Sequence, residues 1–242
     1  MRANHETGAL QPVAELTRTL ADAGRSIPFH CDAVQAVGKI PVDMAALGAD
    51  LLTLSAHKLG GPTGVGALVL AGRLDLSPLL RGGGQERGRR AGTENRPGIA
   101  GFAAAASAAA AEIAVYDRVR RLRDGLEDEI STLAPDAVLV GAAAPRLPNT
   151  MAVALPGLAA ETQVIGLDLD GVMVRAGAAC SSGKVGPSHV LAAMGTAPDI
   201  ARSTIRVSLG WSTSEAEIDH FLKSWMALYR RRRGGVEEAR AA

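Results

Sequence analysis

The sequence has few cysteines, little net charge and no long apolar run. Two of its 242 residues are cysteines, and in a reducing compartment free thiols at Cys31 and Cys180 are a better expectation than a disulfide. The net charge of +1 makes neither nucleic acid nor a membrane surface an obligatory partner. No apolar run approaches the roughly twenty residues that span a bilayer, and the N-terminus lacks the core of a secretory signal. We therefore expect a cytoplasmic protein.

Strand-like and helix-like segments alternate, which predicts an α/β fold with a largely parallel sheet. At 47% hydrophobic residues, the chain can bury a substantial core. The expected helices cover residues 12–23, 43–47, about 96–133, 160–168, 187–194 and 214–230. The expected strands cover residues 27–31, 51–55, 65–70, 138–140, 150–155, 172–175 and 204–209. The long central helix is expected to contain the boundary between two lobes, and the tail from residue 231 to fray.

Lys58 carries the strongest chemical signal. It follows a largely apolar stretch, residues 49–54, which predicts a buried strand that leads into a Gly/Pro-rich turn. A lysine in a partly desolvated cleft has a lowered pKa, and its free amine forms Schiff bases. A surface lysine is the alternative, but Ser55 and His57 count against it because they offer hydrogen-bond donors to an anion.

Asp32 closes the preceding predicted strand, so an acid and a lysine stand at the ends of successive strands. Pyridoxal phosphate chemistry needs this pair, since the amine holds the aldehyde and the carboxylate holds the pyridinium proton. Gln35 is placed to donate its amide to the cofactor's phenolic oxygen. Taken alone, Asp32 equally fits a helix N-cap before Ala33, and Gln35 a solvated polar residue.

Residues 81–93 form a basic, glycine-rich segment without the glycine spacing of the nucleotide-binding loops. It either carries Thr93 into the phosphate site of a neighbouring subunit or is a solvated basic loop.

Two further candidates lie late in the chain. Cys180, among small residues and glycines, suits a reachable thiol that reacts as the thiolate; a buried small hydrophobe is the alternative, which fits Cys31 better. Arg206 is a basic residue on an apolar strand and needs an anion there. A substrate carboxylate and a structural ion pair explain it equally well.

Together these motifs closely resemble the cysteine desulfurases of the NifS/IscS type, class V members of the fold type I pyridoxal-phosphate enzymes. The conjunction of motifs is specific, and it extends from residue 4 to about residue 228. The motifs are Asn-His-Glu-Thr-Gly (4–8), His-Cys-Asp-Ala-Val-Gln (30–35), Ser-Ala-His-Lys (55–58), the glycine-rich segment (82–93), Ala-Cys-Ser-Ser-Gly (179–183) and Ile-Arg-Val-Ser-Leu-Gly (205–210).

The resemblance implies a fold type I transferase with an incomplete, mainly parallel large domain and a small C-terminal α+β domain. Residues 1–115 would be the C-terminal part of the large cofactor-binding domain, residues 116–230 the small domain with the cysteine loop, and residues 231–242 a flexible tail. Relatives of this family carry a long segment before the first motif, with a histidine that stacks on the cofactor. The resemblance therefore describes an N-terminally truncated chain.

The resemblance also implies roles for the candidate residues. Lys58 would hold pyridoxal 5'-phosphate and move protons, and Cys180 would take the sulfur of L-cysteine as a persulfide and release L-alanine. The implied cofactor ligands are His5, Asp32, Gln35, Ser55, His57, Lys58 and Thr93, the last from the partner subunit of a homodimer. Asn4 and Arg206 would bind the substrate, and no metal is implied.

The sulfur would pass to an iron–sulfur scaffold or a sulfur carrier, for cluster assembly or tRNA thiolation. His5 departs from the family pattern, which has asparagine there; an imidazole can still hydrogen-bond the phenolic oxygen. The alternatives are another class V enzyme, an aminotransferase or selenocysteine lyase, and an inactive truncated homologue that only binds a partner.

Overall fold

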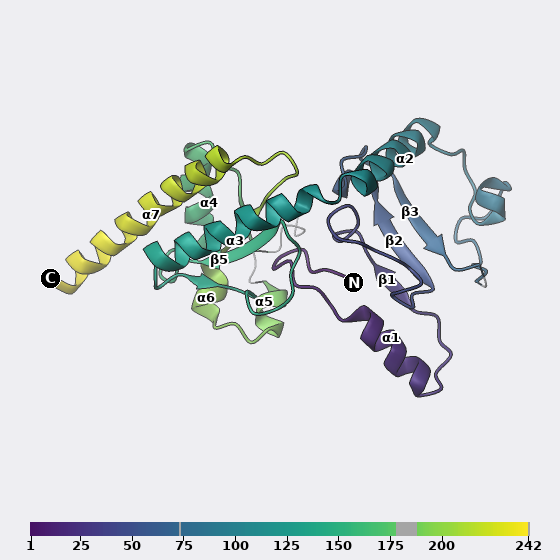
Figure 1. Ribbon diagram of the computed structural model, residues 1–242, viewed down its shortest axis with the longest axis horizontal. Helices are drawn as coiled ribbons and strands as arrows, with labels where there is room; N and C mark the ends of the chain where they lie inside the picture. The colour runs from purple at the N-terminus through teal and green to yellow at the C-terminus, as the bar shows by residue number, and fades with distance from the viewer. Residues whose placement is uncertain (73, 178–187, 242) are drawn as a thin grey trace. The chain divides into compact units, whose positions relative to one another are not determined.

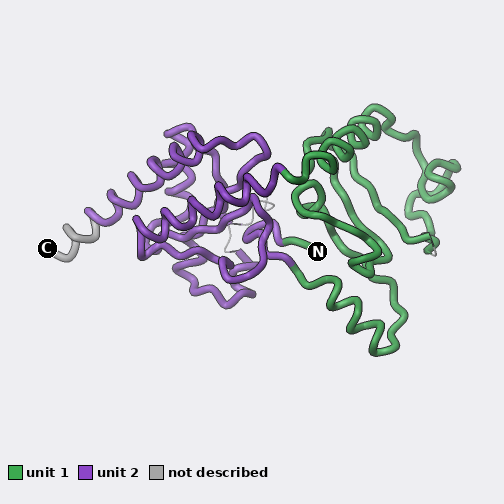
Figure 2. Tube along the Cα trace, viewed as in Figure 1, with its two compact units in different colours: residues 1–3, 11–114 green, residues 4–10, 115–242 purple. Residues whose placement is uncertain are grey.

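The computed structural model describes residues 1–72, 74–177 and 188–241, the last seven by their backbone alone. The chain forms two compact units (Figure 2). The first comprises residues 1–3 and 11–114, and the second comprises residues 4–10 and 115–242. The sequence analysis placed its domain boundary after residue 115 and assigned residues 4–10 to the first domain. In the structure this short segment belongs to the second unit.

The first unit is a small sheet with helices (Figure 1). Its elements are α1 (Val13–Asp22), β1 (His30–Asp32), β2 (Leu51–Ser55), the 3-10 helix η1 (Ala56–Lys58), β3 (Gly66–Leu70), the 3-10 helix η2 (Gln85–Gly88) and α2 (Arg96–Ala111). Within the described residues the strand order is β1-β2-β3. The β1–β2 pair is parallel, as expected, whereas β3 runs antiparallel to β2, so this sheet is mixed.

The core of the first unit is formed by β1, β2, the turns between them and the first residue of α1. Its fully or nearly buried side chains are Val13, Cys31, Ala33, Leu47, Ala49 and Leu52. Burial raises the pKa of the Cys31 thiol, which keeps it neutral. Cys31 is therefore a core residue, the assignment that the sequence favoured for it.

Two of the expected helices do not form as single helices. Residues 43–47 form a single turn in which Asp43 Oδ1 accepts a hydrogen bond from the Ala46 amide. The turn stops at Gly48, which has a left-handed φ of 62° and has no room for a Cβ beside Thr17. The long central helix is two helices, α2 and α3 (Val115–Leu133). The break lies where the chain passes from one unit to the other.

The second unit is an antiparallel sheet covered on both faces by helices. Besides α3, its elements are β4 (Val138–Leu139), β5 (Thr150–Ala154), α4 (Ala160–Leu169), β6 (Arg175–Ala176), α5 (His189–Ala193), α6 (Pro198–Arg202), β7 (Thr204–Ser208) and α7 (Glu215–Ala241). Among the described residues the strand order is β4-β5-β7-β6. This is the small α+β domain that the sequence predicted.

The central strand β5 is buried along its whole length because it contributes to two cores. Met151 and Val153 face the larger core, built around Trp225, with α3, α4 and α7. Ala152 and Ala154 face a smaller core with α5 and α6. This alternation is the two-residue period of a strand.

The C-terminal segment is helical. Helix α7 continues through Ala241, beyond residue 230, where the sequence analysis ended the last helix. Two contacts involve helix residues just beyond residue 230. Arg232 forms an ion pair with Asp136, and the Arg233 guanidinium lies 5.9 Å from the centre of the Tyr229 ring.

Within the described residues, no single helix is both long and apolar enough to cross a membrane. Helices α2 and α3 meet the length and composition test only when they are taken together.

A buried ion pair fixes the loop that holds residues 4–10 in the second unit. Arg146 donates two hydrogen bonds to the Glu127 carboxylate, at 2.6 and 2.7 Å, and the two side chains are 5% and 10% exposed. The Arg146 backbone pairs with Ala9, and the Leu147 amide donates to the Gly8 carbonyl at 2.8 Å. A helix residue, Glu127, thus supports the Asn-His-Glu-Thr-Gly segment.

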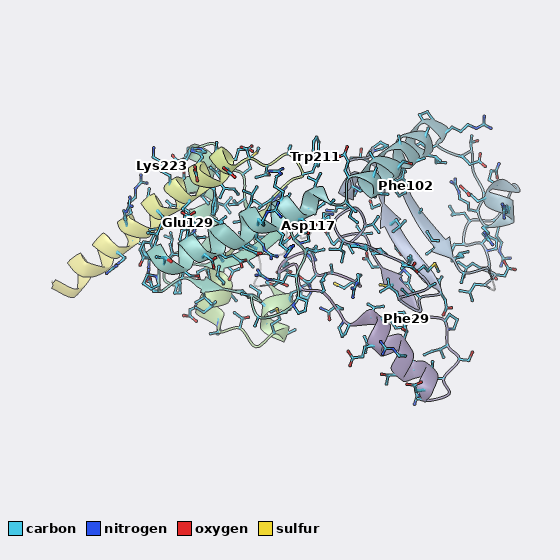
Figure 3. The ribbon with its side chains drawn as sticks, in the orientation of Figure 1. Phe29, Phe102, Asp117, Glu129, Trp211 and Lys223 are labelled. Atoms are coloured by element: carbon cyan, nitrogen blue, oxygen red, sulfur yellow. The ribbon has the colours of Figure 1, made fainter. Side chains whose placement is uncertain are left out.

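Glu127→Ala is expected to lower the free energy of unfolding by about 3 kcal/mol, because it leaves the Arg146 guanidinium buried without its carboxylate. Chemical denaturation followed by circular dichroism measures this loss. The matched control is Asp117→Ala, which removes an exposed partner of Arg120 on the same helix (Figure 3) and should cost less than about 1 kcal/mol. Equal losses from both substitutions would contradict this role for Glu127.

Candidate active site

The first unit brings Asp32 and Lys58 to the same edge of its sheet. Strand β1 ends at Asp32, and strand β2 ends at Ser55, immediately before the η1 turn that contains Lys58. The two strands are parallel, with Asp32 opposite Thr53, so their carboxyl ends lie together (Figure 1). Both side chains are exposed. A ligand at this edge can therefore reach an amine and a carboxylate.

Asp32 also shapes the chain that follows it. Its Oδ1 accepts a hydrogen bond from the Val34 amide at 2.8 Å, and the Ala33 amide donates to the Thr53 carbonyl at 3.1 Å. Residues 34–39 form turns and not a helix. Asp32 therefore caps a turn, and the alternative that it caps a helix is wrong. Gln35 is half-buried within these turns.

Ser55 and His57 form a polar pair beside Lys58. The Ser55 hydroxyl and His57 Nδ1 are 2.9 Å apart and hydrogen-bonded. The turn beyond them is tight, because the Gly61 amide donates to the Ala56 carbonyl at 2.9 Å and a Cβ on Gly61 would lie 3.0 Å from that of Ala56. A hydroxyl and an imidazole at this turn are suitable donors to a phosphate.

Thr93 lies in an irregular segment before α2 and is exposed. Asn95 caps that helix by accepting a hydrogen bond from the Gly98 amide at 3.1 Å. Among the described residues, the structure shows no hydrogen bond from Thr93 to Ser55 or His57. Its role in the site of a partner subunit stays a prediction.

The second unit holds Asn4, His5 and Arg206 together. Arg206 lies on β7, is half-buried, and donates from Nη1 to the His5 carbonyl at 2.8 Å. Asn4 Oδ1 accepts hydrogen bonds from the Glu6 amide at 2.8 Å and the Thr7 amide at 3.1 Å, which folds the segment into a turn. The Asn4 side chain thus has a structural role in this turn, in addition to the substrate-binding role that the resemblance implies.

Two polar residues that sequence analysis missed join this cluster. Glu6 is 4% exposed; its Oε2 accepts a hydrogen bond from the Ser188 hydroxyl at 2.5 Å, and its Oε1 lies 3.8 Å from His5 Nε2. Ser188 also caps α5 through the Leu191 amide at 3.1 Å. No local signal identified this contact because it joins residues far apart in the sequence. Cys180 lies outside the described residues.

Lys39 is a third residue that the sequence analysis missed. It is half-buried in the turn after β1, and its Nζ donates to the Lys58 carbonyl at 3.0 Å. Burial, together with the nearby positive charge of Lys58, lowers the pKa of Lys39 to about 8. The only local sign was a lysine inside a largely apolar turn.

Residues 1–221 match the family model described as aminotransferase class-V. The chain belongs to the class V aminotransferase family. Enzymes of this family and its cysteine desulfurases depend on pyridoxal phosphate. The family assignment agrees with the resemblance drawn from the motifs.

Curated relatives in this family are named cysteine desulfurases. One from Enterobacter agglomerans is 45% identical over 219 residues, which cover 90% of this chain and 54% of the relative. Another from Cereibacter sphaeroides is 47% identical over 226 residues, which cover 92% of this chain and 57% of the relative. The chain thus spans just over half the length of the curated relatives it matches.

The fold agrees with the same family. A crystal structure of a NifS-like protein from Rickettsia africae matches with a TM-score of 0.86 and 35% identity, over 95% of this chain and 60% of that chain. The predicted fold, a type I pyridoxal-phosphate transferase of α/β class, is confirmed, with a mixed sheet in the first unit in place of a mainly parallel one.

Proposed function

We propose that this chain carries the Schiff-base lysine and the sulfur-accepting cysteine of a pyridoxal-phosphate-dependent cysteine desulfurase. The observation that supports the proposal is the parallel pairing of β1 and β2, which brings the strand end at Asp32 next to the strand that leads into the turn of Lys58. The desulfurase names of relatives at 45% and 47% identity support it.

The residues at this edge fit the functional groups of pyridoxal phosphate. Lys58 would bind its aldehyde carbon covalently, and Asp32 would hold the proton on its ring nitrogen. The hydrogen-bonded pair of Ser55 and His57 would bind its phosphate, and Gln35 its phenolic oxygen. When bound, the cofactor withdraws electrons from the α-carbon of an amino acid substrate.

Residues of the chain would carry out the remaining steps. The Lys58 amine, once displaced by the amine of the substrate, would take a proton from the substrate α-carbon and deliver protons later. Arg206 would hold the substrate carboxylate with its two-pronged guanidinium. The carbonyl of His5 already orients that guanidinium from one side.

Sulfur transfer would fall to Cys180. Its thiolate would attack the sulfur of L-cysteine, so that a sulfur–sulfur bond forms as the carbon–sulfur bond breaks. The electron pair of the broken bond stays with the substrate carbon, which gains a proton and leaves as L-alanine. The outer sulfur of the Cys180 persulfide would then pass to an iron–sulfur scaffold or sulfur carrier. The protein would act as a homodimer in which Thr93 of each subunit reaches the phosphate site of the other.

Incubation of the cofactor-loaded protein with L-cysteine tests the proposed function. The expected result is L-alanine and transferable sulfur in equal amounts. An aminotransferase would instead produce a keto acid, and a selenocysteine lyase would release alanine from selenocysteine in preference to cysteine. Either result would contradict the desulfurase proposal.

Arg206→Lys is expected to raise KM for L-cysteine by about tenfold or more with a smaller change in kcat, because a lysine cannot form the paired hydrogen bonds to a carboxylate. Steady-state alanine formation measures both constants. The matched control is Arg202→Lys, at an exposed position on the neighbouring helix α6. An unchanged KM in Arg206→Lys would remove Arg206 from the substrate site.

A further inference from the structure

The two segments that present Asp32 and Lys58 are joined by a third side chain. Lys39 belongs to the turns that follow β1, and its Nζ donates to the main-chain carbonyl of Lys58 at 3.0 Å. The contact spans nineteen residues of sequence and links the segments that follow two parallel strands. It acts on the backbone of Lys58 and leaves the Lys58 side-chain amine available.

Close packing accompanies this hydrogen bond. Gly38 has a left-handed φ of 77°, and a Cβ at that position would lie 3.2 Å from the Cβ of Leu59 and 3.1 Å from that of Ala109. The turn before Lys39 is therefore pressed against the residue after Lys58, with room for glycine alone. Steric and polar contacts thus act on the same two segments.

The base of the Lys39 side chain is itself held firmly. The Lys39 and Ile40 amides both donate to the Ala36 carbonyl at 3.1 Å, and Ala33 and Ala36 are fully buried. The backbone that bears Lys39 is therefore already ordered, and only the side chain loses freedom when it bonds to the Lys58 carbonyl.

The surroundings of Lys39 differ from those of a solvated surface lysine. Burial and the nearby charge of Lys58 both disfavour its protonated form and bring its pKa to about 8. The Lys58 carbonyl is the hydrogen-bond partner that the structure shows for this amine.

We propose that Lys39 is a positioning residue that ties the turn after Asp32 to the turn of Lys58 and so fixes the separation of the cofactor's acid and amine. This inference rests on the proposed function, because it concerns the same site. Lys39 does not touch the reacting atoms. Its effect is carried by the backbone of residues 56–61.

Three substitutions test the proposal. Lys39→Met keeps the length and volume of the stem but removes the donor, whereas Lys39→Arg keeps a donor. The control is Lys223→Met, at an exposed position on α7 (Figure 3). The first measurement is amide hydrogen exchange over residues 56–61 without cofactor. We expect exchange at least about threefold faster in Lys39→Met and little change in the other two variants.

The second measurement is a titration with pyridoxal phosphate, followed by the absorbance of the Lys58-bound cofactor. We expect a dissociation constant about tenfold higher in Lys39→Met, an intermediate value in Lys39→Arg, and no change in Lys223→Met. Thermal unfolding without cofactor shows that the variants are folded during the titration.

The outcomes separate this inference from the proposed function. Equal dissociation constants in the parent protein and Lys39→Met would overturn the positioning role while leaving the proposed function intact. A parent protein that does not bind the cofactor at Lys58 would overturn both. Altered exchange with unaltered cofactor affinity would reduce Lys39 to a structural contact and also contradict the proposal.

Discussion

Lys58→Ala is expected to abolish covalent binding of pyridoxal phosphate. Lys58 presents an amine in the turn that follows the carboxyl end of β2, and a methyl group cannot replace it as a nucleophile toward an aldehyde. The absorbance band of the lysine-bound cofactor should be lost, and substrate turnover with it. The cofactor should then wash out on gel filtration, because only non-covalent contacts to residues such as Ser55 and His57 remain.

The control for this prediction is Lys223→Ala, which removes an exposed amine that has no proposed role in the site. This substitution should leave the absorbance band unchanged. Circular dichroism of both variants should match the parent protein, since the Lys58 side chain is exposed and contributes little to the core. A Lys58→Ala protein that retains the band at full occupancy would show that another amine binds the cofactor.

Cys180→Ala is expected to lower sulfur transfer by at least about a hundredfold while cofactor binding at Lys58 is unchanged. The reason is chemical: alanine has no thiolate to accept the substrate sulfur, whereas the groups that hold the cofactor belong to other segments. Persulfide formed after addition of L-cysteine can be trapped with an alkylating reagent and located by mass spectrometry. The modification should lie on Cys180.

The matched control is Cys31→Ala, because the structure places Cys31 in the core of the first unit with no exposed surface. Its neutral, buried thiol cannot reach a substrate, so this variant should retain sulfur transfer. Undiminished transfer in Cys180→Ala, or loss in Cys31→Ala with the fold preserved, would argue against the assignment.

The regular elements were largely predictable from the sequence because their signals are local. Strand β2 has the predicted bounds, since its largely apolar residues end a few positions before Gly60, Gly61 and Pro62. The break between α2 and α3 was not predictable, because no glycine or proline marks it. The break coincides with the boundary between the two compact units, and this boundary is defined by tertiary contacts.

The candidate site divides in the same way. Asp32 and Lys58 were found because Asp32 ends one strand and Lys58 lies just after the next, and parallel pairing brings strand ends together. The sequence did not indicate the partner of Lys39, which is Lys58, or the partner of Glu6, which is Ser188. Each contact joins a side chain to a distant segment, so neither periodicity nor motif spacing could locate it.

Hydride reduction of the cofactor-loaded protein tests the central claim most directly. Reduction converts the bond between cofactor and lysine into a stable amine, and mass spectrometry of the digested protein identifies the modified residue. Lys39 is an internal competitor, because its amine has a pKa of about 8 and lies beside the Lys58 backbone. The account predicts modification of Lys58. Modification of Lys39 instead, or of exposed lysines without preference, would contradict it.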